Sequence, residues 1–266
     1  MLGEARLVAR QAGEILLASR PDPARLKILE TTAKSSPTDL VSALDAASEN
    51  FIVQGISSRF PLDGIIGEEG TNRNGTSGRH WIVDPLDGTI NYLYGAPHWA
   101  VSIALEDESG LLLGVVYAPA LGVEYFALRG VGANRVDERG EVQLPPVRET
   151  SLASALFATG FSYESSKRKM QAEDFVHILP KIQDIRRNGS AALDLCMVAD
   201  GSINGYFEVG AKPWDYSAGV LIAQEAGAVA SGLFGKPASP DYVVCAAPLL
   251  QRQMVALLES LEQKKS

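Results

Sequence analysis

Two aspartates three positions apart, at the end of an apolar run, are the residues of this chain that most directly suggest chemistry. Asp84 directly follows the apolar run of residues 81–83. A turn that contains Pro85 comes next, and Asp87 directly precedes Gly88 and Thr89. A carboxylate at the end of a buried strand is costly to leave unpaired, so a bound cation is its natural partner. If Thr89 opens a helix, the backbone N–H groups of Gly88 and Thr89 can hold a phosphate beside that cation.

A simpler interpretation is that Asp87 only caps a helix, as aspartate often does. That interpretation leaves other acids in similar places unexplained. Glu68 and Glu69 follow the apolar pair Ile65–Ile66, and Asp215 stands at an expected helix start. Each of these acids taken singly is more often structural than functional. Together they favour a shared metal site.

Other catalytic signatures fit the chain less well. The haloacid dehalogenase phosphatases need a nucleophilic aspartate two residues before the second aspartate of DxDGT, and Pro85 occupies that position. The sequence contains no GxSxG, HExxH or P-loop motif. Gly130 and Gly132 lack the third glycine of a dinucleotide fingerprint and fit a hairpin turn better.

Two helices and a series of short strands must position the acids. Apolar residues at helical spacing predict helices over residues 3–19 and 39–60, which Pro21 and Pro61 bring to an end. Short β-branched runs then predict an antiparallel or mixed sheet behind the two helices. The expected strands are residues 64–67, 81–84, 100–105, 115–117 and 124–128.

A polar stretch with two prolines at residues 144–151 marks the expected boundary between an N-terminal half, residues 1–145, and a C-terminal half, residues 146–266. Strand and helix patterns alternate beyond it, which indicates an α/β arrangement. The expected strands are 154–158, 184–187, 203–208 and 242–246, and the expected helices are 169–179, 191–199, 214–226 and 249–263.

The composition excludes several classes of protein. The chain has 266 residues, of which 46% are hydrophobic, enough for one large core or two modest ones. A formal net charge of −8 argues against nucleic acid and membrane partners, because polyanion binding needs clustered cations. Cys196 and Cys245 lie far apart, so neither a disulfide scaffold nor a zinc site is expected. The lack of a secretory signal favours a cytoplasmic location.

Over nearly its whole length the chain resembles the inositol monophosphatase family. Four blocks carry the resemblance: Lys34–Val41 with Asp45, Gly67–Glu69, Asp84–Asn91 and Trp214–Gly219. A fifth block, Gly189–Ala192 followed by Gly201 and Glu208, resembles the substrate-facing wall of the family. The resemblance implies a fold of mixed α+β and α/β character, a layered αβαβα sandwich of the inositol monophosphatase and fructose bisphosphatase type. Its active site would lie between the two halves.

The family also implies a Mg²⁺-dependent enzyme with two or three metal ions, for which Mn²⁺ is a possible substitute. The implied metal ligands are Glu68, Asp84, the main-chain carbonyl of Leu86, Asp87 and Asp215, with Asp84 bridging two ions. These are the hard oxygen ligands that Mg²⁺ requires. Two metal ions would clamp the attacking water and the leaving alkoxide of an in-line phosphoryl displacement.

The remaining expected roles also come from the resemblance. Thr89 and Asp45 would orient and deprotonate the water, and Glu69 is a further expected catalytic residue near a weaker third ion. The residues implied for phosphate and substrate binding are Lys34, Gly88, Thr89, Gly189, Ser190, Ala191 and Glu208. Without the family, Asp45 would be interpreted as a solvated helix residue. Trp81 and Trp214 are expected to pack beneath the site rather than contact substrate.

The expected reaction is hydrolysis of myo-inositol monophosphate to inositol and phosphate. Fructose bisphosphate, histidinol phosphate and phosphoadenosine phosphate stay open as alternatives, because the metal residues are common to enzymes for all of them, while Glu208 with Gly189–Ala191 favours inositol. Lithium inhibition and a homodimer are further properties of the family. A binding or scaffolding protein that has kept the fold is disfavoured, because every metal-ligand position is filled.

Overall fold

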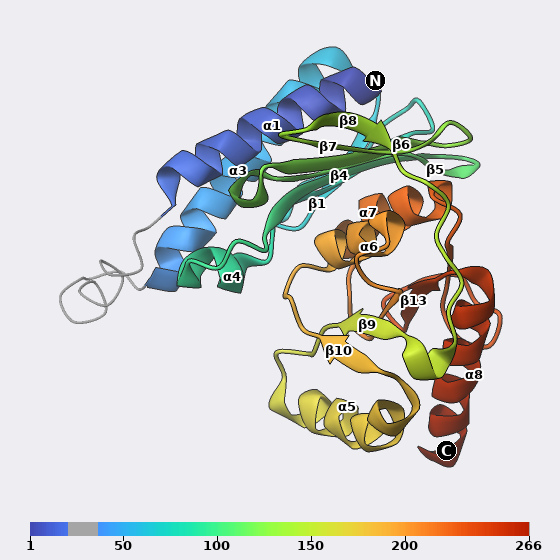
Figure 1. The fold of residues 1–266 in the computed structure, drawn as a ribbon. Coiled ribbons are helices and arrows are strands. Elements are labelled where there is room, and N and C mark those ends of the chain that lie inside the picture. The colour runs from blue at the N-terminus through green and yellow to red at the C-terminus, as the bar shows by residue number, and fades with distance from the viewer. Residues whose placement is uncertain (21–36, 266) are drawn as a thin grey trace.

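The computed structural model describes residues 1–20 and 37–265, which form alternating layers of helix and sheet (Figure 1). Helices α1 (Leu2–Ser19) and α3 (Pro37–Arg59) cover the outer face of the first sheet. Helices α6 (Ala191–Asp200) and α7 (Pro213–Glu225) lie between the two sheets. Helices α5 (Ser165–Ile178) and α8 (Pro248–Lys265) cover the outer face of the second sheet. The expected αβαβα sandwich is confirmed.

The first sheet has eight strands in the order β2-β1-β3-β4-β5-β6-β7-β8. Their bounds are β1 Gly64–Gly67, β2 Asn72–Arg73, β3 His80–Asp87, β4 Ala100–Asp107, β5 Gly110–Ala118, β6 Val123–Leu128, β7 Gly132–Asp137 and β8 Gly140–Gln143. Strand β1 pairs parallel with β3 and the other neighbours pair antiparallel, so the sheet is mixed. The hairpin expected at Gly130 and Gly132 joins β6 to β7.

The second sheet has five strands in the order β10-β9-β11-β13-β12. Their bounds are β9 Leu156–Thr159, β10 Asp184–Arg186, β11 Gly205–Glu208, β12 Val229–Ser231 and β13 Val243–Ala246. Short helices complete the fold: α4 Thr89–Tyr94 and the 3₁₀ turns η1 Pro119–Leu121, η2 Leu152–Ser154 and η3 Leu179–Lys181. Strands β9, β10 and β11 are parallel to one another, and β13 runs antiparallel to its neighbours β11 and β12.

Helix α1 illustrates how the sequence pattern becomes packing. Its buried stripe, which includes Ala5, Val8, Ala12 and Leu16, faces the first sheet and α3. Gly13 lies on the same stripe, and a Cβ there would stand 2.6 Å from the ring of Tyr117. The helix can therefore lie close to the sheet only because that position is glycine.

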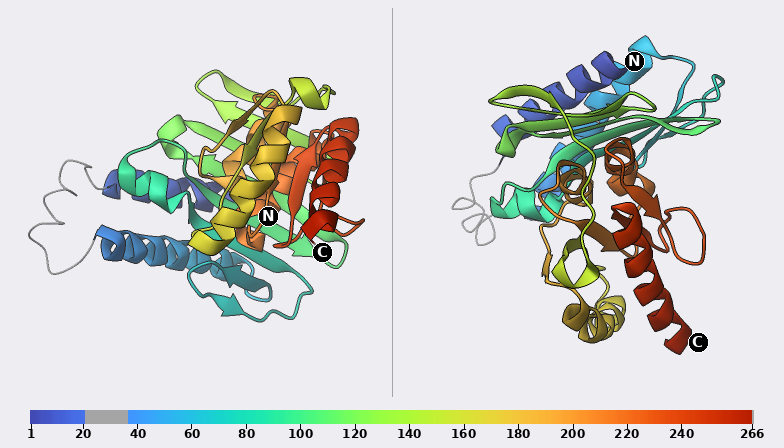
Figure 2. Two further views of the ribbon diagram at one scale, coloured as in Figure 1. Left: turned by 90° about the horizontal axis from the view of Figure 1, so that it is seen from below. Right: turned by 45° about the vertical axis from the view of Figure 1, so that its right-hand side comes forward.

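Apolar side chains fill the space between all the layers. One cluster joins α1 and α3 to the first sheet, a second joins both sheets to α6 and α7, and a third joins the second sheet to α5 and α8. Figure 2 shows α1 and α8 on opposite sides of the molecule. The two sheets are thus held together by the middle pair of helices, α6 and α7.

Some elements differ from the sequence expectation. Helix α5 begins at Ser165, four residues before the expected start at 169. Strands β2, β7, β8 and β12 had no expected counterpart. Strand β8 is exposed at every position and β7 is mostly half-buried, so neither has the buried–exposed alternation that identifies a strand. The polar stretch 144–151 lies between β8 and η2, and the division into halves there stays a prediction. None of the helices described is long and apolar enough to span a membrane.

Candidate active site

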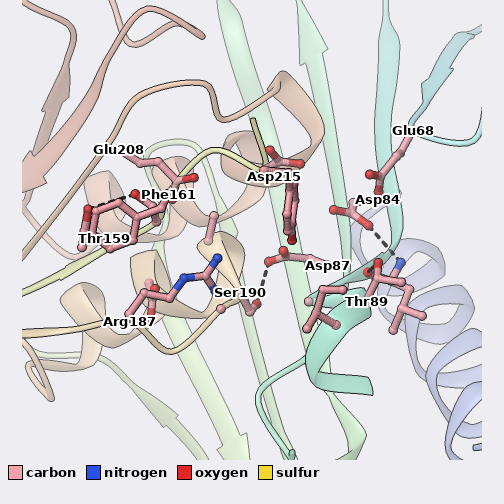
Figure 3. A pocket seen from close by; sticks show the side chains of 18 residues that line it. Glu68, Asp84, Asp87, Thr89, Thr159, Phe161, Arg187, Ser190, Glu208 and Asp215 are labelled. Carbon is pink, nitrogen blue, oxygen red and sulfur yellow. Dashed lines mark hydrogen bonds between the residues drawn. The ribbon is translucent and has the colours of Figure 1, made fainter. Parts of the chain in front are cut away.

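A cavity of about 390 Å³ opens between the two sheets, and four carboxylates stand along one part of its wall (Figure 3). Glu68 follows β1, Asp84 and Asp87 lie on β3, and Asp215 lies in the first turn of α7. The other lining residues are Leu86, Gly88, Thr89, Ile90, Thr159, Gly160, Phe161, Tyr163, Arg187, Gly189, Ser190, Ala191, Asp194 and Glu208. The fold therefore brings together residues from both halves of the sequence.

A bulge at the end of β3 carries its two aspartates into this wall. Asp84 pairs with Ser102 and Asp87 with Ala100, so residues 85 and 86 oppose a single residue of β4. Pro85 fits such a position because it has no N–H to donate to the sheet. The strand is buried through Trp81–Asp87, which explains why both carboxylates end inside the protein.

Local hydrogen bonds hold the turn after Asp84. Oδ1 of Asp84 accepts from the backbone N–H of Leu86 at 2.9 Å, and Oγ1 of Thr89 donates to the carbonyl of Leu86 at 3.1 Å. The expected helix start at Thr89 is confirmed as α4, which is six residues long. Gly88 precedes α4 with a φ of 91°, a conformation that glycine adopts readily.

Asp87 joins the first sheet to α6. Its Oδ2 accepts from Oγ of Ser190 at 2.6 Å and from the backbone N–H of Ala192 at 2.8 Å. The hydroxyl of Ser190 also accepts from the N–H of Leu193, as the cap of α6. One oxygen of Asp87 is thus held by α6, and its other oxygen is left for the cavity.

A second contact joins α4, which follows β3, to the loop before α6. Nδ2 of Asn91, on α4, donates to the carbonyl of His98 at 2.6 Å and to the carbonyl of Asn188 at 2.7 Å. Asn188 lies in the loop that leads to α6. The cavity wall is therefore tied across the two sheets by both Asp87 and Asn91.

Glu49 is a buried acid that the sequence pattern did not single out. Its carboxylate accepts from the N–H of Glu69 at 2.8 Å and from the N–H of Thr71 at 3.0 Å. The same carboxylate occupies the space that a side chain at Gly67 would need. Glu49 therefore holds the loop that carries Glu68, and its position one helical turn after Asp45 is the signal that could have identified it.

The cavity wall holds negative charge that the protein itself does not neutralise. Desolvation and the charges of Asp215, Glu69 and Glu49 raise the pKa of Glu68 to about 7, against the opposing effect of its interaction with Asp84. Burial raises the pKa of Asp215 to about 6, and it raises the pKa values of Asp84 and Asp87 well above their usual range. In the part of the chain that the structure describes, none of the four forms an ion pair with Lys or Arg.

The donor set fits a hard cation such as Mg²⁺. It consists of oxygens alone. Asp84 and Asp87 are buried, and a divalent ion would relieve the repulsion between them and the neighbouring carboxylates of Glu68 and Asp215. Within residues 1–20 and 37–265, no group of three His, Cys, Asp or Glu side chains is arranged so that it could hold one metal ion. Binding would therefore have to draw the carboxylates of the cavity wall closer together.

Two expected site residues, Asp45 and Glu69, do not line the cavity. Asp45, on α3, is 3% exposed, and its Oδ1 has no hydrogen-bond partner among the described residues. Burial, followed by the charges of Glu69 and Glu68, raises the pKa of Asp45 to about 8. The side chain of Glu69 is exposed and does not line the cavity. Lys34 lies outside the described residues.

The expected substrate wall does line the cavity, through Gly189, Ser190, Ala191 and Glu208. Oε2 of Glu208 accepts from the hydroxyl of Tyr206 at 2.6 Å, and the carboxylate lies where a side chain at Gly160 would be. Burial raises the pKa of Glu208.

Neither tryptophan of the motifs lines the cavity, and both pack in the core. Trp81 is fully buried and its Nε1 donates to Asp63 at 3.0 Å, while Trp214 packs on the core between the sheets. Thr159, Arg187 and Asp194 are lining residues that the sequence did not indicate. Arg187 stands two residues before the Gly189–Ala192 block, which was the available signal.

Comparison with known proteins supports a single family. The profile of the inositol monophosphatase family matches residues 1–265. "Inositol-1-monophosphatase SuhB" of Mycobacterium tuberculosis is 40% identical over 85% of this chain and 80% of its own length. "Nus factor SuhB" of Escherichia coli is 37% identical over 88% of this chain and 86% of its own length.

Solved structures agree in fold. The structure of Mycobacterium tuberculosis SuhB has a TM-score of 0.80 at 36% identity and covers 97% of this chain and 95% of its own. An inositol monophosphatase structure from Anabaena has a TM-score of 0.83 at 30% identity, with the same coverage of 97% and 95%. Both similarities extend across both sheets.

Proposed function

The chain belongs to the inositol monophosphatase family, and we propose that it is a Mg²⁺-dependent phosphatase that hydrolyses a small phosphate monoester. The observation that carries the proposal is the set of four carboxylates on one cavity wall, Glu68, Asp84, Asp87 and Asp215, with no ion pair among the described residues. A metal site accounts for this arrangement, because a bound cation would offset the repulsion among the four carboxylates. A purely structural role leaves that repulsion unexplained.

The ligands would be the four carboxylates together with the main-chain carbonyl of Leu86. When bound, Mg²⁺ or Mn²⁺ would offset the phosphate charge and lower the pKa of the attacking water. The charges of Glu68, Asp87 and Asp215 all raise the pKa of Asp84, after burial, so Asp84 interacts with every other carboxylate of the set. These interactions are compatible with Asp84 as the ligand common to two ions, as the family resemblance implies.

The protein's own residues would orient the reactants. The hydroxyl of Thr89 donates to the carbonyl of Leu86, so its oxygen stays available to accept a hydrogen bond from the attacking water. Asp45 does not line the cavity, and the resemblance implies that it would receive the proton by way of Thr89. Because α4 is short, individual N–H groups near Gly88, rather than a helix dipole, would contact the phosphate.

Inositol monophosphate is the substrate that we propose first. Glu208 presents a carboxylate to the cavity, and a carboxylate accepts hydrogen bonds from the hydroxyls of a polyol. The hydroxyl of Ser190 is occupied by Asp87 and by the cap of α6, so we assign Ser190 a positioning role in addition to its place in the wall.

A substrate panel tests the activity. Metal-stripped protein supplied with Mg²⁺ should release phosphate, and kcat/KM should be highest for inositol 1-phosphate among inositol 1-phosphate, fructose bisphosphate, histidinol phosphate and phosphoadenosine phosphate. Lithium should inhibit. A clear preference for another ester would move the assignment to that substrate, and absence of phosphate release from every ester would contradict the proposal.

The relatives that are named Nus factors make a non-catalytic role the second candidate. A variant without phosphatase activity that still met the need of the cell would favour it. A homodimer, a cytoplasmic location and the absence of nucleic-acid partners stay predictions in either case.

Replacing Ser190 with alanine should weaken metal binding. The change removes the hydroxyl that donates to Oδ2 of Asp87 and the cap of α6, so the carboxylate loses its fixed direction. Loss of such a supporting hydrogen bond lowers metal affinity by roughly 10- to 100-fold. The Mg²⁺ concentration for half-maximal phosphate release measures the effect. Ser260→Ala on α8, which removes a hydroxyl bonded to the carbonyl of Leu257, is the matched control. An unchanged Mg²⁺ requirement in Ser190→Ala would refute the positioning role.

A further inference from the structure

Helix α4, which begins at Thr89 on the cavity wall, has little packing of its own (Figure 3). It is six residues long, and an isolated helix of fewer than roughly 12 residues is marginal in water. Of its six residues, all of them described, only Tyr92 is buried, and its N-cap, Gly88, has no side chain that could cap it. The position of Thr89 therefore depends on contacts that other elements make with α4.

Arg20, which directly follows α1, supplies such contacts. Its Nε donates to the carbonyl of Tyr92 at 3.1 Å. Its Nη2 donates to the carbonyl of Asn91 at 3.1 Å and to the carbonyl of Ala96. The last carbonyls of a helix lack partners within the helix, so these bonds satisfy the C-terminal end of α4. The hydroxyl of Tyr92 also donates to the carbonyl of Leu16 on α1 at 2.7 Å, so the end of α1 holds the end of α4.

Two aromatic rings fix the direction of this guanidinium. The Cζ atom of Arg20 lies 5.6 Å from the ring centre of Tyr92 and 5.8 Å from that of Trp99, distances at which a cation is attracted to an aromatic ring. The two rings meet edge to face with their centres 5.0 Å apart, and both are fully buried. A planar guanidinium can lie against rings and bond several carbonyls at once, whereas a lysine ammonium is a compact point charge.

The side chain of Asn91 fixes α4 from another direction. It donates to the carbonyl of His98 at 2.6 Å and to the carbonyl of Asn188 at 2.7 Å, while Arg20 bonds the main-chain carbonyl of the same residue. Asn91 stands two residues after Thr89 in a helix of one and a half turns. A shift of Asn91 would therefore move Thr89 as well.

We propose that Arg20 is a positioning residue for the hydrolysis, and that it sets the place of Thr89 by fixing the C-terminal end of α4. The inference rests on the proposed function, in which the hydroxyl of Thr89 orients the attacking water. Asp84 has its own bond to the N–H of Leu86, and Asp87 is held by α6. Removal of the guanidinium should therefore displace Thr89 while the metal ligands keep their places. Arg20 itself does not line the cavity and acts through α4.

The kinetics of Arg20→Met and Arg20→Lys test the proposal, below the unfolding temperature of each variant. We expect kcat for phosphate release at saturating Mg²⁺ and ester to fall roughly 10- to 100-fold in Arg20→Met, because a misplacement of about 1 Å can cost that much. The Mg²⁺ concentration for half-maximal release should stay at the wild-type value. Arg20→Lys should recover part of kcat, because it restores the charge but not the planar group.

Arg129→Met is the matched control. Nε of Arg129 donates to the carbonyl of Leu111 at 2.7 Å and Nη2 donates to the carbonyl of Gly110 at 3.0 Å, so this arginine also bonds main-chain carbonyls, but outside the cavity lining. The control should keep the wild-type kcat. A wild-type kcat in Arg20→Met would overturn the proposal. An equally large loss of Mg²⁺ affinity would overturn it too, because the effect would then lie at the metal ligands.

Hydrogen exchange gives a readout that does not depend on activity. The amides of Tyr92 and Ala96, which bond the carbonyls of Gly88 and Asn91, should exchange faster in metal-free Arg20→Met than in wild type. The amides of α8 should keep their wild-type rates, which a general loss of stability would not allow. Unchanged exchange in α4 would contradict the proposal even if activity fell. If wild-type protein releases no phosphate from any ester, the proposed function fails, and the exchange rates still show whether Arg20 fixes α4.

Discussion

Asp84→Asn will lower Mg²⁺-dependent phosphate release by roughly 10³-fold or more in kcat/KM and will at the same time stabilise the metal-free protein at alkaline pH. The loss of activity follows from the proposed role of Asp84 as a metal ligand, in which its charge acts together with those of Glu68, Asp87 and Asp215. An amide has no charge to bind the ions. The two effects have opposite signs, which a general loss of folding cannot produce.

The stabilisation follows from burial. Asp84 is 1% exposed, and its surroundings raise its pKa well above the usual range, so its ionised form opposes folding when no metal is bound. Asn keeps the shape and the acceptor for the N–H of Leu86, which bonds Asp84 at 2.9 Å. An increase in free energy of unfolding of about 1 kcal/mol would raise the Tm by about 2–4 °C.

The measurements are phosphate release with saturating Mg²⁺ and thermal unfolding in EDTA. Asp241→Asn, an exposed aspartate outside the cavity lining, is the control and should change neither. A variant that kept wild-type kcat/KM would rule out Asp84 as a metal ligand. A lower Tm in EDTA would show instead that the carboxylate of Asp84 supports the fold.

The stability of the metal-free protein will fall as the pH rises from about 5 to about 8, and Mg²⁺ will restore more stability at the upper end of that range. Burial raises the pKa of Glu68 from 4.5 to about 7, of Asp215 from 3.8 to about 6 and of Asp45 from 3.8 to about 8. Between the unfolded and folded pKa values the folded state holds more protons than the unfolded state. Raising the pH therefore favours unfolding over this interval.

Bound metal reverses the effect, because it takes the place of those protons. Thermal unfolding with and without Mg²⁺ at about pH 5.5 and about pH 8 gives the comparison, and we expect the increase in Tm with Mg²⁺ to be larger by about 5 °C or more at the higher pH. Metal binding near neutral pH should also release protons into a weakly buffered solution. Equal increases in Tm at both pH values would mean that these carboxylates are not the groups the metal binds.

Short-range patterns predicted much of this protein. The helices over residues 3–19, 39–60 and 249–263 follow from apolar spacing and are found at Leu2–Ser19, Pro37–Arg59 and Pro248–Lys265. The Asp84–Asn91 block predicted a buried strand, a turn and a helix start in a single segment. These features depend on neighbours in the chain, so the sequence contains them directly.

Features that depend on distant partners were not predictable in the same way. Strands β7 and β8 form an edge whose stability comes from pairing with β6 rather than from a buried face of their own. Glu49 looks like a solvated helix residue until its carboxylate meets the loop at Glu69 and Thr71. Arg187 looks like a surface arginine until the loop at Gly189 places it on the cavity wall.

By itself the sequence determined which residue types are available for chemistry: a set of acids at strand and helix ends, in an order that indicates one family. The tertiary structure alone decided their directions. It bent β3 by a bulge so that Asp84 and Asp87 enter one wall, and it fixed one oxygen of Asp87 on α6. It also placed Arg187 on the cavity wall, where its charge acts on Asp194 and Glu208. The physical reason is that a side chain's charge is set by its own chemistry, whereas its burial and hydrogen-bond partners are supplied by segments far away in the chain.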